Sequence, residues 1–251
     1  KYGNDLHCIR ENDIKHTIYY KIFVNIIHKS IATFGVPEST LAEMLDSWEN
    51  SLPSNIKLAY LPSPSTGIRL RLSVYDGEKE SNNGLMERYV SSLKEFLGNT
   101  IVYGAESDTL DSIVKELLIS NSLTLSLAES CTGGEISSSL VSNAGASSFY
   151  KGGVVTYSNN SKESILGVPS QIIDKYGAVS SECAESMALS AQKLFSSDIS
   201  LATTGIAGPS GGSEEKPVGT IWMAVAIKGV VTSHSARFYG DRKRNIIRFT
   251  S

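Results

Sequence analysis

The chain has 251 residues, of which 41% are hydrophobic and 20% charged, and its formal net charge is −3. This composition excludes a highly charged disordered chain, and the mild acidic balance excludes a broad basic surface for nucleic acid or anionic lipid. No run approaches the roughly 18 consecutive apolar residues of a membrane-spanning helix. At about 150 residues per domain, one or two domains are expected.

The cysteines and histidines are few and scattered along the chain. Cys8, Cys131 and Cys183 form no CxxC pair, which argues against a disulfide scaffold and favours a reducing cytoplasm. None of the four histidines forms an HExxH motif or pairs with a cysteine at metal-ligand spacing. We therefore expect a cytoplasmic protein that holds no metal and no cofactor.

The residue composition changes near Gly104, so we place a domain boundary there. We expect a connector over residues 1–24, a small α+β module over 25–104 and a second domain over 105–251. The module's predicted strands are the runs His28–Phe34, Ile56–Leu61 and the strictly alternating Ile68–Val74.

Two helices are predicted in the same module. The first begins at Pro37 and continues through Leu41, Leu45 and Trp48. The second is indicated by apolar residues at helical spacing, namely Leu85, Tyr89, Leu93 and Phe96.

In the second domain strands and helices alternate, which predicts a layered α/β domain with a mixed sheet. Its last two strands are joined at Lys228-Gly229, a predicted hairpin. The predicted helices are Asp108–Ile119, Gly133–Val141 and Ser180–Phe195, and the predicted strands are Leu123–Ala128, Gly152–Tyr157, Ile199–Thr204, Gly219–Ile227 and Val230–Phe238. Ligands gather at the loops that leave the carboxyl ends of such strands.

The first of these loops, AESCTGG over residues 128–134, lies between a predicted buried strand and a helix. Ser130 and Thr132 offer hydroxyls, Glu129 offers a carboxylate, and Gly133 lets the backbone present N–H groups to an anion. Simple capping of the helix by a hydroxyl is the alternative. Cys131 could be a nucleophile, but a small buried thiol is its more ordinary role.

The second loop, within GGVVTYSNNSK over residues 152–162, carries Lys162 about one helical turn beyond a strand. A lone lysine is usually solvated, but a desolvated lysine close to Ser130 could be neutral and take a proton from it. No histidine lies near either loop, so a Ser–Lys pair is favoured over a Ser–His–Asp triad. Tyr157 could relay a proton or stack on a planar ring, or simply pack in the core.

The third loop, TTGIAGPSGGSEEKPVGT over residues 203–220, is long and rich in glycine. A loop of this length inside a compact domain is usually functional or disordered. Its glycines permit close backbone approach to a ligand, and Lys216 could meet a phosphate or carboxylate. No GKS or GKT follows, so it is not a Walker loop.

The fourth loop precedes the last predicted helix and contains the sequence GDR over residues 240–242. Asp241 is a good residue for the N-cap of that helix. Arg242 could hold a phosphate through two parallel hydrogen bonds.

Together the motifs AESCTGG, GGVVTYSNNSK, GAVSSECA, TTGIAGPSGGSEEKPVGT and GDR resemble the competence/damage-inducible CinA family, over nearly all of residues 105–251. The segment TFGVPEST…LPSNIKLAYLPSPSTGIRLRL resembles the family's KH-type middle module, and this match continues through most of residues 28–104. The resemblance implies two modules of a longer architecture, in which full-length members begin with a molybdopterin-binding-like domain.

The resemblance also implies an activity, the hydrolysis of nicotinamide mononucleotide to nicotinate mononucleotide and ammonia in pyridine nucleotide recycling. It makes Ser130 the nucleophile, Lys162 its base and Tyr157 a third catalytic residue. It suggests a homodimer as well. The substrate-binding residues that we expect are Glu129, Thr132, Gly133, Thr204, Gly205, Gly208, Gly211, Gly212, Lys216 and Arg242. Donors for the oxyanion are expected at the Thr132-Gly133 helix start or in the glycine-rich loop.

Two other functions stay open at this point. A non-catalytic nucleotide-binding regulator could use the same loops, although binding alone does not need a base. An RNA-binding KH module needs a GxxG loop, and no two glycines of residues 1–104 are three positions apart. We therefore expect a small nucleotide substrate, and neither nucleic acid nor membrane as a partner.

Overall fold

The computed structural model describes residues 26–63, 67–75, 79–98 and 102–250. The chain divides into two compact units, and the division lies between Ser107 and Asp108. The connector predicted for residues 1–24 lies outside the described residues. Within the described ranges, no helix combines the length and the apolar character that crossing a membrane would need.

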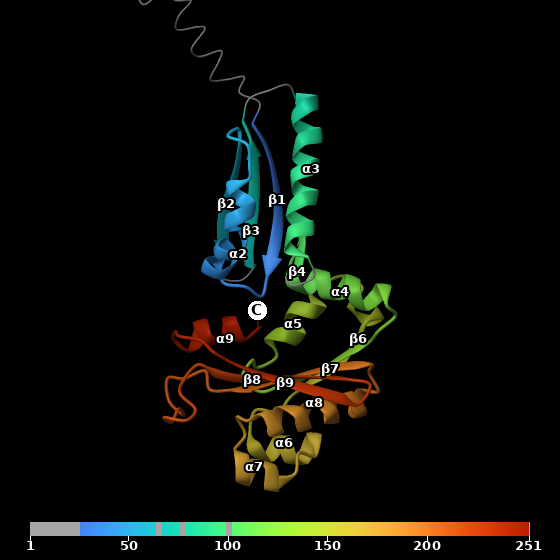
Figure 1. Ribbon diagram of the computed structural model, residues 1–251. Helices are drawn as coiled ribbons and strands as arrows, with labels where there is room; N and C mark the ends of the chain where they lie inside the picture. The colour runs from blue at the N-terminus through green and yellow to red at the C-terminus, as the bar shows by residue number, and fades with distance from the viewer. Residues whose placement is uncertain (1–25, 64–66, 76–78, 99–101, 251) are drawn as a thin grey trace, which may run out of the picture. The chain divides into compact units, whose positions relative to one another are not determined.

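The first unit is a four-stranded antiparallel sheet with helices on it (Figure 1). The strand order is β2-β3-β1-β4. The elements of this unit are β1 (Ile27–Phe34), α2 (Glu38–Asn50), β2 (Ile56–Ser63), β3 (Gly67–Val74), α3 (Lys79–Leu97) and β4 (Val102–Ala105). The α+β character expected for this module is confirmed.

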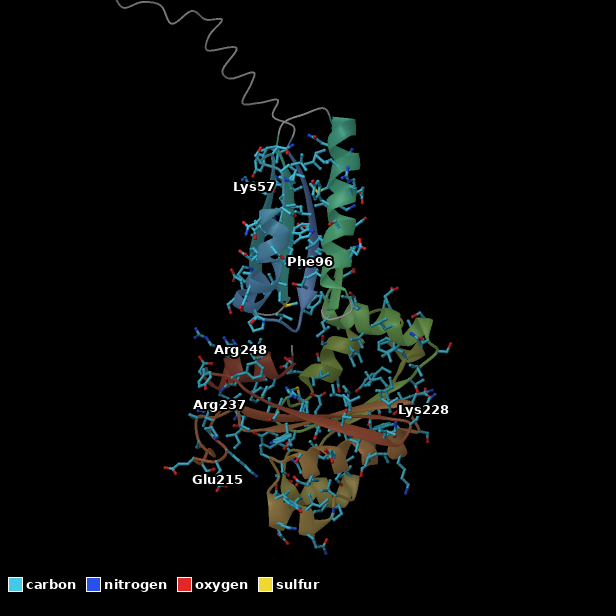
Figure 2. The ribbon with its side chains drawn as sticks, viewed as in Figure 1. Lys57, Phe96, Glu215, Lys228, Arg237 and Arg248 are labelled. Carbon is cyan, nitrogen blue, oxygen red and sulfur yellow. The ribbon has the colours of Figure 1, made fainter. Side chains whose placement is uncertain are left out.

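The core of the first unit lies between the sheet and its helices. Leu70 and Leu72 of β3 are buried against Leu41 and Leu45 of α2, as the alternation in the sequence predicts. The buried face of α3 agrees only in part with the predicted one. It consists of Met86, Val90, Leu93 and Leu97, with Leu85 and Tyr89 partly buried against it, whereas Phe96, labelled in Figure 2, is 47% exposed. Both sets have helical spacing, so periodicity alone could not choose between them.

The second unit is built on a five-stranded mixed sheet in the order β6-β5-β7-β8-β9. β5 pairs in parallel with β6 and β7, while β8 and β9 add antiparallel strands at one side. The strands are β5 (Leu125–Glu129), β6 (Tyr150–Val155), β7 (Ile199–Gly205), β8 (Thr220–Ile227) and β9 (Val230–Arg237). The prediction of a mixed sheet is confirmed.

Helices cover both faces of this sheet (Figure 1). On one face lie α6 (Asn159–Leu166), α7 (Ser170–Tyr176) and α8 (Ser181–Phe195), and on the other α4 (Leu110–Ser120), α5 (Glu135–Val141) and α9 (Arg242–Thr250). The α8 face packs alanine on alanine, for example Ala188 and Ala191 near Ala202 and Ala224. Small side chains let the helix approach the sheet closely, which explains the Ala-rich composition of this domain.

Several predicted boundaries shift by one or two residues. The helix predicted from Gly133 begins at Glu135, because Gly133 and Gly134 adopt positive φ angles of 65° and 100° and form a turn. The strand predicted over Gly152–Tyr157 ends at Val155. The hairpin at Lys228-Gly229 is confirmed, and Figure 2 labels Lys228 there, at the end of the sheet opposite Glu215. Helix α7 was not predicted.

Candidate functional site

The three parallel strands of the second unit end at one edge of the sheet. Ser130 follows β5 directly, Thr156 follows β6, and the glycine-rich loop follows β7. β5 lies between the other two strands, so the loop that carries Ser130 is flanked by both of the others. This is the position at which α/β sheets gather ligands.

Ser130 and Lys162 meet at this edge. The Lys162 Nζ lies 2.9 Å from Ser130 Oγ and 2.7 Å from the backbone oxygen of Thr156. The capping box of Ser158 and Ser161 fixes the start of α6, and Lys162 lies in its first turn. Lys162 is 1% exposed and Ser130 is 6% exposed, so neither is a solvated surface residue.

The surroundings of Lys162 favour the neutral amine. Burial lowers the pKa of Lys162 below its usual range, because the ammonium form loses its hydration. The thiols of Cys183 and Cys131 lie close enough to act weakly in the opposite direction. A neutral amine has a lone pair for the Ser130 hydroxyl proton and an N–H for the Thr156 carbonyl.

Glu129 holds the turn that presents Ser130. Its carboxylate accepts hydrogen bonds from the backbone N–H groups of Gly134, Ile136 and Ser137, at 3.0, 3.2 and 2.8 Å. It also accepts one from the Ser137 hydroxyl at 2.6 Å. Glu129 is 1% exposed, and both of its carboxylate oxygens accept hydrogen bonds from the start of α5. These contacts indicate a structural role, not the substrate contact expected from the sequence.

Cys131 is a small buried thiol. It packs with Ala207, Ile221 and Phe249, and its sulfur lies beside Gly205. Burial raises the pKa of Cys131 to about 12, so the thiol is protonated at neutral pH. The structure therefore favours a packing role for Cys131 over a nucleophilic one.

Buried threonines tie these loops together. Thr132 Oγ1 is 2.8 Å from Thr203 Oγ1, which joins the Ser130 loop to the end of β7. The Thr204 hydroxyl donates to the Ala178 carbonyl at 2.7 Å, just before α8. Both predicted binding threonines thus have protein partners.

Tyr157 and Arg242 come together in a second cluster. Arg242 donates from Nη2 to the Tyr157 hydroxyl and from Nη1 to the Gly208 carbonyl, each at 2.8 Å. Tyr157 is 61% exposed and bonds Arg242 rather than Lys162. Asp241 caps the helix as predicted, by accepting from the Arg244 N–H. The last helix therefore brings a guanidinium to the glycine-rich loop.

Gly205 and Gly208 of that loop lie where a side chain would collide with neighbouring atoms. A Cβ on Gly205 would lie 2.7 Å from the Thr220 oxygen, and one on Gly208 would lie 2.5 Å from Val218. Gly211 and Gly212 are exposed. Lys216 donates to the backbone oxygen of Tyr176, so it fastens the loop to α7.

Sequence reasoning gave no role to two buried residues at this edge. Thr156 accepts from Lys162, and its N–H donates to the Glu129 oxygen at 2.8 Å. Asn245 of α9 is buried and donates to the Ala207 oxygen at 3.0 Å. Two features of the sequence could have pointed to them. Thr156 is a polar residue at the end of a predicted strand, and Asn245 is a polar residue on the apolar side of the last helix.

Among the described residues, no group of three or more His, Cys, Asp or Glu side chains is placed to hold a metal ion. An open hollow of about 480 Å³ lies in the first unit, lined by Ser54, Asn55, Lys57 and Tyr75. It contains none of the predicted site residues.

Comparisons with known proteins match each of the two units to a family domain. Residues 107–251 match the family described as CinA C-terminal domain, and residues 28–104 match the family described as Damage-inducible protein CinA KH domain. The CinA-like protein of Flavobacterium psychrophilum is 41% identical over 89% of this chain and 53% of its own length. That of Cytophaga hutchinsonii is 43% identical over 88% of this chain and 53% of its own. The chain thus spans about half the length of these curated relatives.

Solved structures give the same result. A CinA superfamily protein from Escherichia coli is 38% identical, with a TM-score of 0.55 over 59% of this chain and 90% of its own. A competence/damage inducible protein from Agrobacterium tumefaciens is 41% identical, with a TM-score of 0.53 over 56% of this chain and 85% of its own. With both parts matched by family and with relatives of this identity, the chain belongs to the CinA family.

Proposed function

We propose that this chain is an amidase that hydrolyses nicotinamide mononucleotide to nicotinate mononucleotide and ammonia. The observation that carries the proposal is the contact of 2.9 Å between Ser130 and the buried amine of Lys162. A serine paired with a lysine of lowered pKa is an activated nucleophile, and a protein that only binds a nucleotide does not need one.

The reaction runs in two halves. The Ser130 hydroxyl gives its proton to the lone pair of Lys162, and its oxygen attacks the carboxamide carbon. Collapse of the tetrahedral intermediate returns that proton to the leaving nitrogen, which departs as ammonia and leaves an ester on Ser130. Water then gives a proton to Lys162 and attacks the ester, which releases the carboxylate and restores the serine.

The oxyanion of the tetrahedral intermediate needs fixed N–H donors. The Gly133 N–H is occupied by the Ser130 carbonyl at 3.2 Å, and the Gly134 N–H by Glu129. The backbone N–H groups of Cys131 and Thr132 donate to no other described residue. We therefore assign these two groups to the oxyanion, next to the nucleophile itself.

The cluster of Tyr157 and Arg242 suits the rest of the substrate. Two of the five N–H donors of Arg242 are used within the protein, which leaves others for the 5′-phosphate. The exposed ring of Tyr157 offers an aromatic face to the positively charged pyridinium ring. The glycine-rich loop, whose Gly208 carbonyl accepts from Arg242, would meet the same phosphate.

The proposal is tested by incubating the protein with nicotinamide mononucleotide and measuring ammonia. We expect wild-type turnover, and a loss of at least about 10³-fold in Ser130→Ala. Ser139→Ala, an exposed serine of α5, is the matched control and should keep full activity. Binding of the nucleotide without ammonia would favour the non-catalytic regulator instead. The homodimer stays an expectation from the family resemblance, and the cytoplasmic location stays an expectation from the scattered cysteines.

A further inference from the structure

A buried hydroxyl without a partner lies beside the candidate dyad. Thr156 is 0% exposed, and its Oγ1 has no hydrogen-bond partner. Leaving a buried hydroxyl unpaired costs stability, so each such group in a folded protein asks for an explanation. The backbone of Thr156 is fully engaged, with its N–H on Glu129 and its carbonyl on Lys162.

The proposed reaction changes the number of hydrogens on the neighbouring amine. The neutral Lys162 amine has two N–H groups and a lone pair, and in the proposed reaction the lone pair takes the Ser130 hydroxyl proton. After it takes the serine proton, it is an ammonium with three N–H groups and no lone pair. One of these has the Thr156 carbonyl as its acceptor, and one is directed at the serine oxygen and the leaving nitrogen. The third needs an acceptor that the neutral amine did not need.

We propose that the Thr156 hydroxyl is that acceptor, kept unpaired in the free protein and used when Lys162 becomes an ammonium. It belongs to the residue whose backbone carbonyl already accepts a hydrogen bond from the amine. Thr156 is then a positioning residue that acts through Lys162. This inference rests on the proposed Ser–Lys chemistry, and it deepens it.

Other ionisable groups near Lys162 would not give the same effect. Burial raises the pKa of the Cys131 and Cys183 thiols, which favours the neutral form of each. The Glu129 carboxylate is bound by the start of α5, and the Lys216 amine by the Tyr176 carbonyl. Within the described part of the chain, only the hydroxyl of Thr156 combines burial, the lack of a partner and attachment to the group that holds the amine.

The test uses Thr156→Val, which keeps the shape of the side chain and removes the hydroxyl, and Thr156→Ser, which restores it. Reaction of Ser130 with a fluorophosphonate forms a serine–phosphorus bond and expels fluoride, while Lys162 takes the proton. Its rate between pH 6 and 10 is followed on the Ser130 peptide by mass spectrometry. Ser30→Ala is the control, because Ser30 Oγ is also buried and unpartnered but lies in the first unit.

We expect Thr156→Val to react about tenfold more slowly at high pH, with the rise of its rate moved to lower pH by about one unit. The difference from wild type should therefore shrink as the pH falls. Its melting temperature should not fall, because the variant removes an unpaired hydroxyl. Thr156→Ser should react more like the wild type, and Ser30→Ala should react as the wild type does.

A loss of rate by the same factor at every pH, together with a lower melting temperature, would show a merely structural role and overturn the inference. Unchanged rates in Thr156→Val would overturn it too. If Ser130 reacts as predicted but nicotinamide mononucleotide yields no ammonia, the proposed substrate is wrong and the role of Thr156 stands.

Discussion

At the scale of single residues, the candidate site contains side chains to which we assign chemistry and side chains that hold others in place. We assign Ser130 and Lys162 to the first kind, because both groups are buried and the amine is held in position. Glu129 and Lys216 belong to the second, since each is bound to protein backbone. Arg242 combines both roles, because two of its guanidinium N–H groups bind the protein and the others can bind a ligand.

We predict that Arg242→Lys raises the KM for nicotinamide mononucleotide about tenfold and changes kcat little. A lysine cannot reproduce the planar fork that joins Tyr157, Gly208 and a phosphate. Steady-state kinetics measures both constants. Arg244→Lys is the control, because Arg244 is exposed and its charge faces Asp241. An equal fall of kcat and kcat/KM in Arg242→Lys would place this residue in the chemical step instead.

At the scale of elements, the site depends on how strands end and helices begin. The turn between β5 and α5 is fixed by two glycines of positive φ and by the Glu129 carboxylate on the first N–H groups of the helix. α6 is fixed by a capping box one turn before Lys162. Ser130 and Lys162, on two such rigid ends, are held at hydrogen-bond distance, as the proposed nucleophile and base would need.

We predict that Glu129→Gln lowers the free energy of unfolding of the second unit by about 2–4 kcal/mol. The amide keeps one acceptor oxygen and places an NH₂ group against backbone N–H groups that the carboxylate now satisfies. Denaturant titration followed by circular dichroism measures the loss. Glu135→Gln is the matched control. Glu135 is an exposed acid in the first turn of α5, the turn that Glu129 binds, and its substitution should change the free energy of unfolding by less than about 0.5 kcal/mol. Equal stability of the two variants would contradict the role given to Glu129.

The sequence predicts much of this element structure, and its failures have physical causes. Apolar runs predict the strands except β4, the succession of strands and helices predicts the mixed sheet, and Lys228-Gly229 predicts the hairpin. Helix α7 was missed because it is one of the shortest helices and lies between Pro169 and Gly177. The capping role of Glu129 could not be read from its spacing, because an acid beside a nucleophile also fits a substrate contact. The hydroxyl of Thr156 could be recognised as unpaired only from three-dimensional contacts.

At the scale of the whole molecule, the two units carry separate cores and separate family matches. The KH domain match ends at Gly104 and the C-terminal domain match begins at Ser107, beside the division of the structure. The predicted site residues all lie in the second unit. The formal net charge of −3 does not argue against the proposed phosphorylated substrate, because its recognition would rest on a few placed cations such as Arg242 and not on a surface field.

The central claim is that a buried, neutral Lys162 activates Ser130. It is tested most directly by the pH dependence of kcat/KM for nicotinamide mononucleotide in the wild type and in Lys162→Arg. Because burial lowers the pKa of Lys162, the wild-type value should rise with pH as the ammonium loses its proton and level off below the usual pKa range of lysine. Lys162→Arg, whose side chain stays protonated, should lose activity by at least about 10³-fold at every pH. A Lys162→Arg variant with wild-type activity would contradict the account.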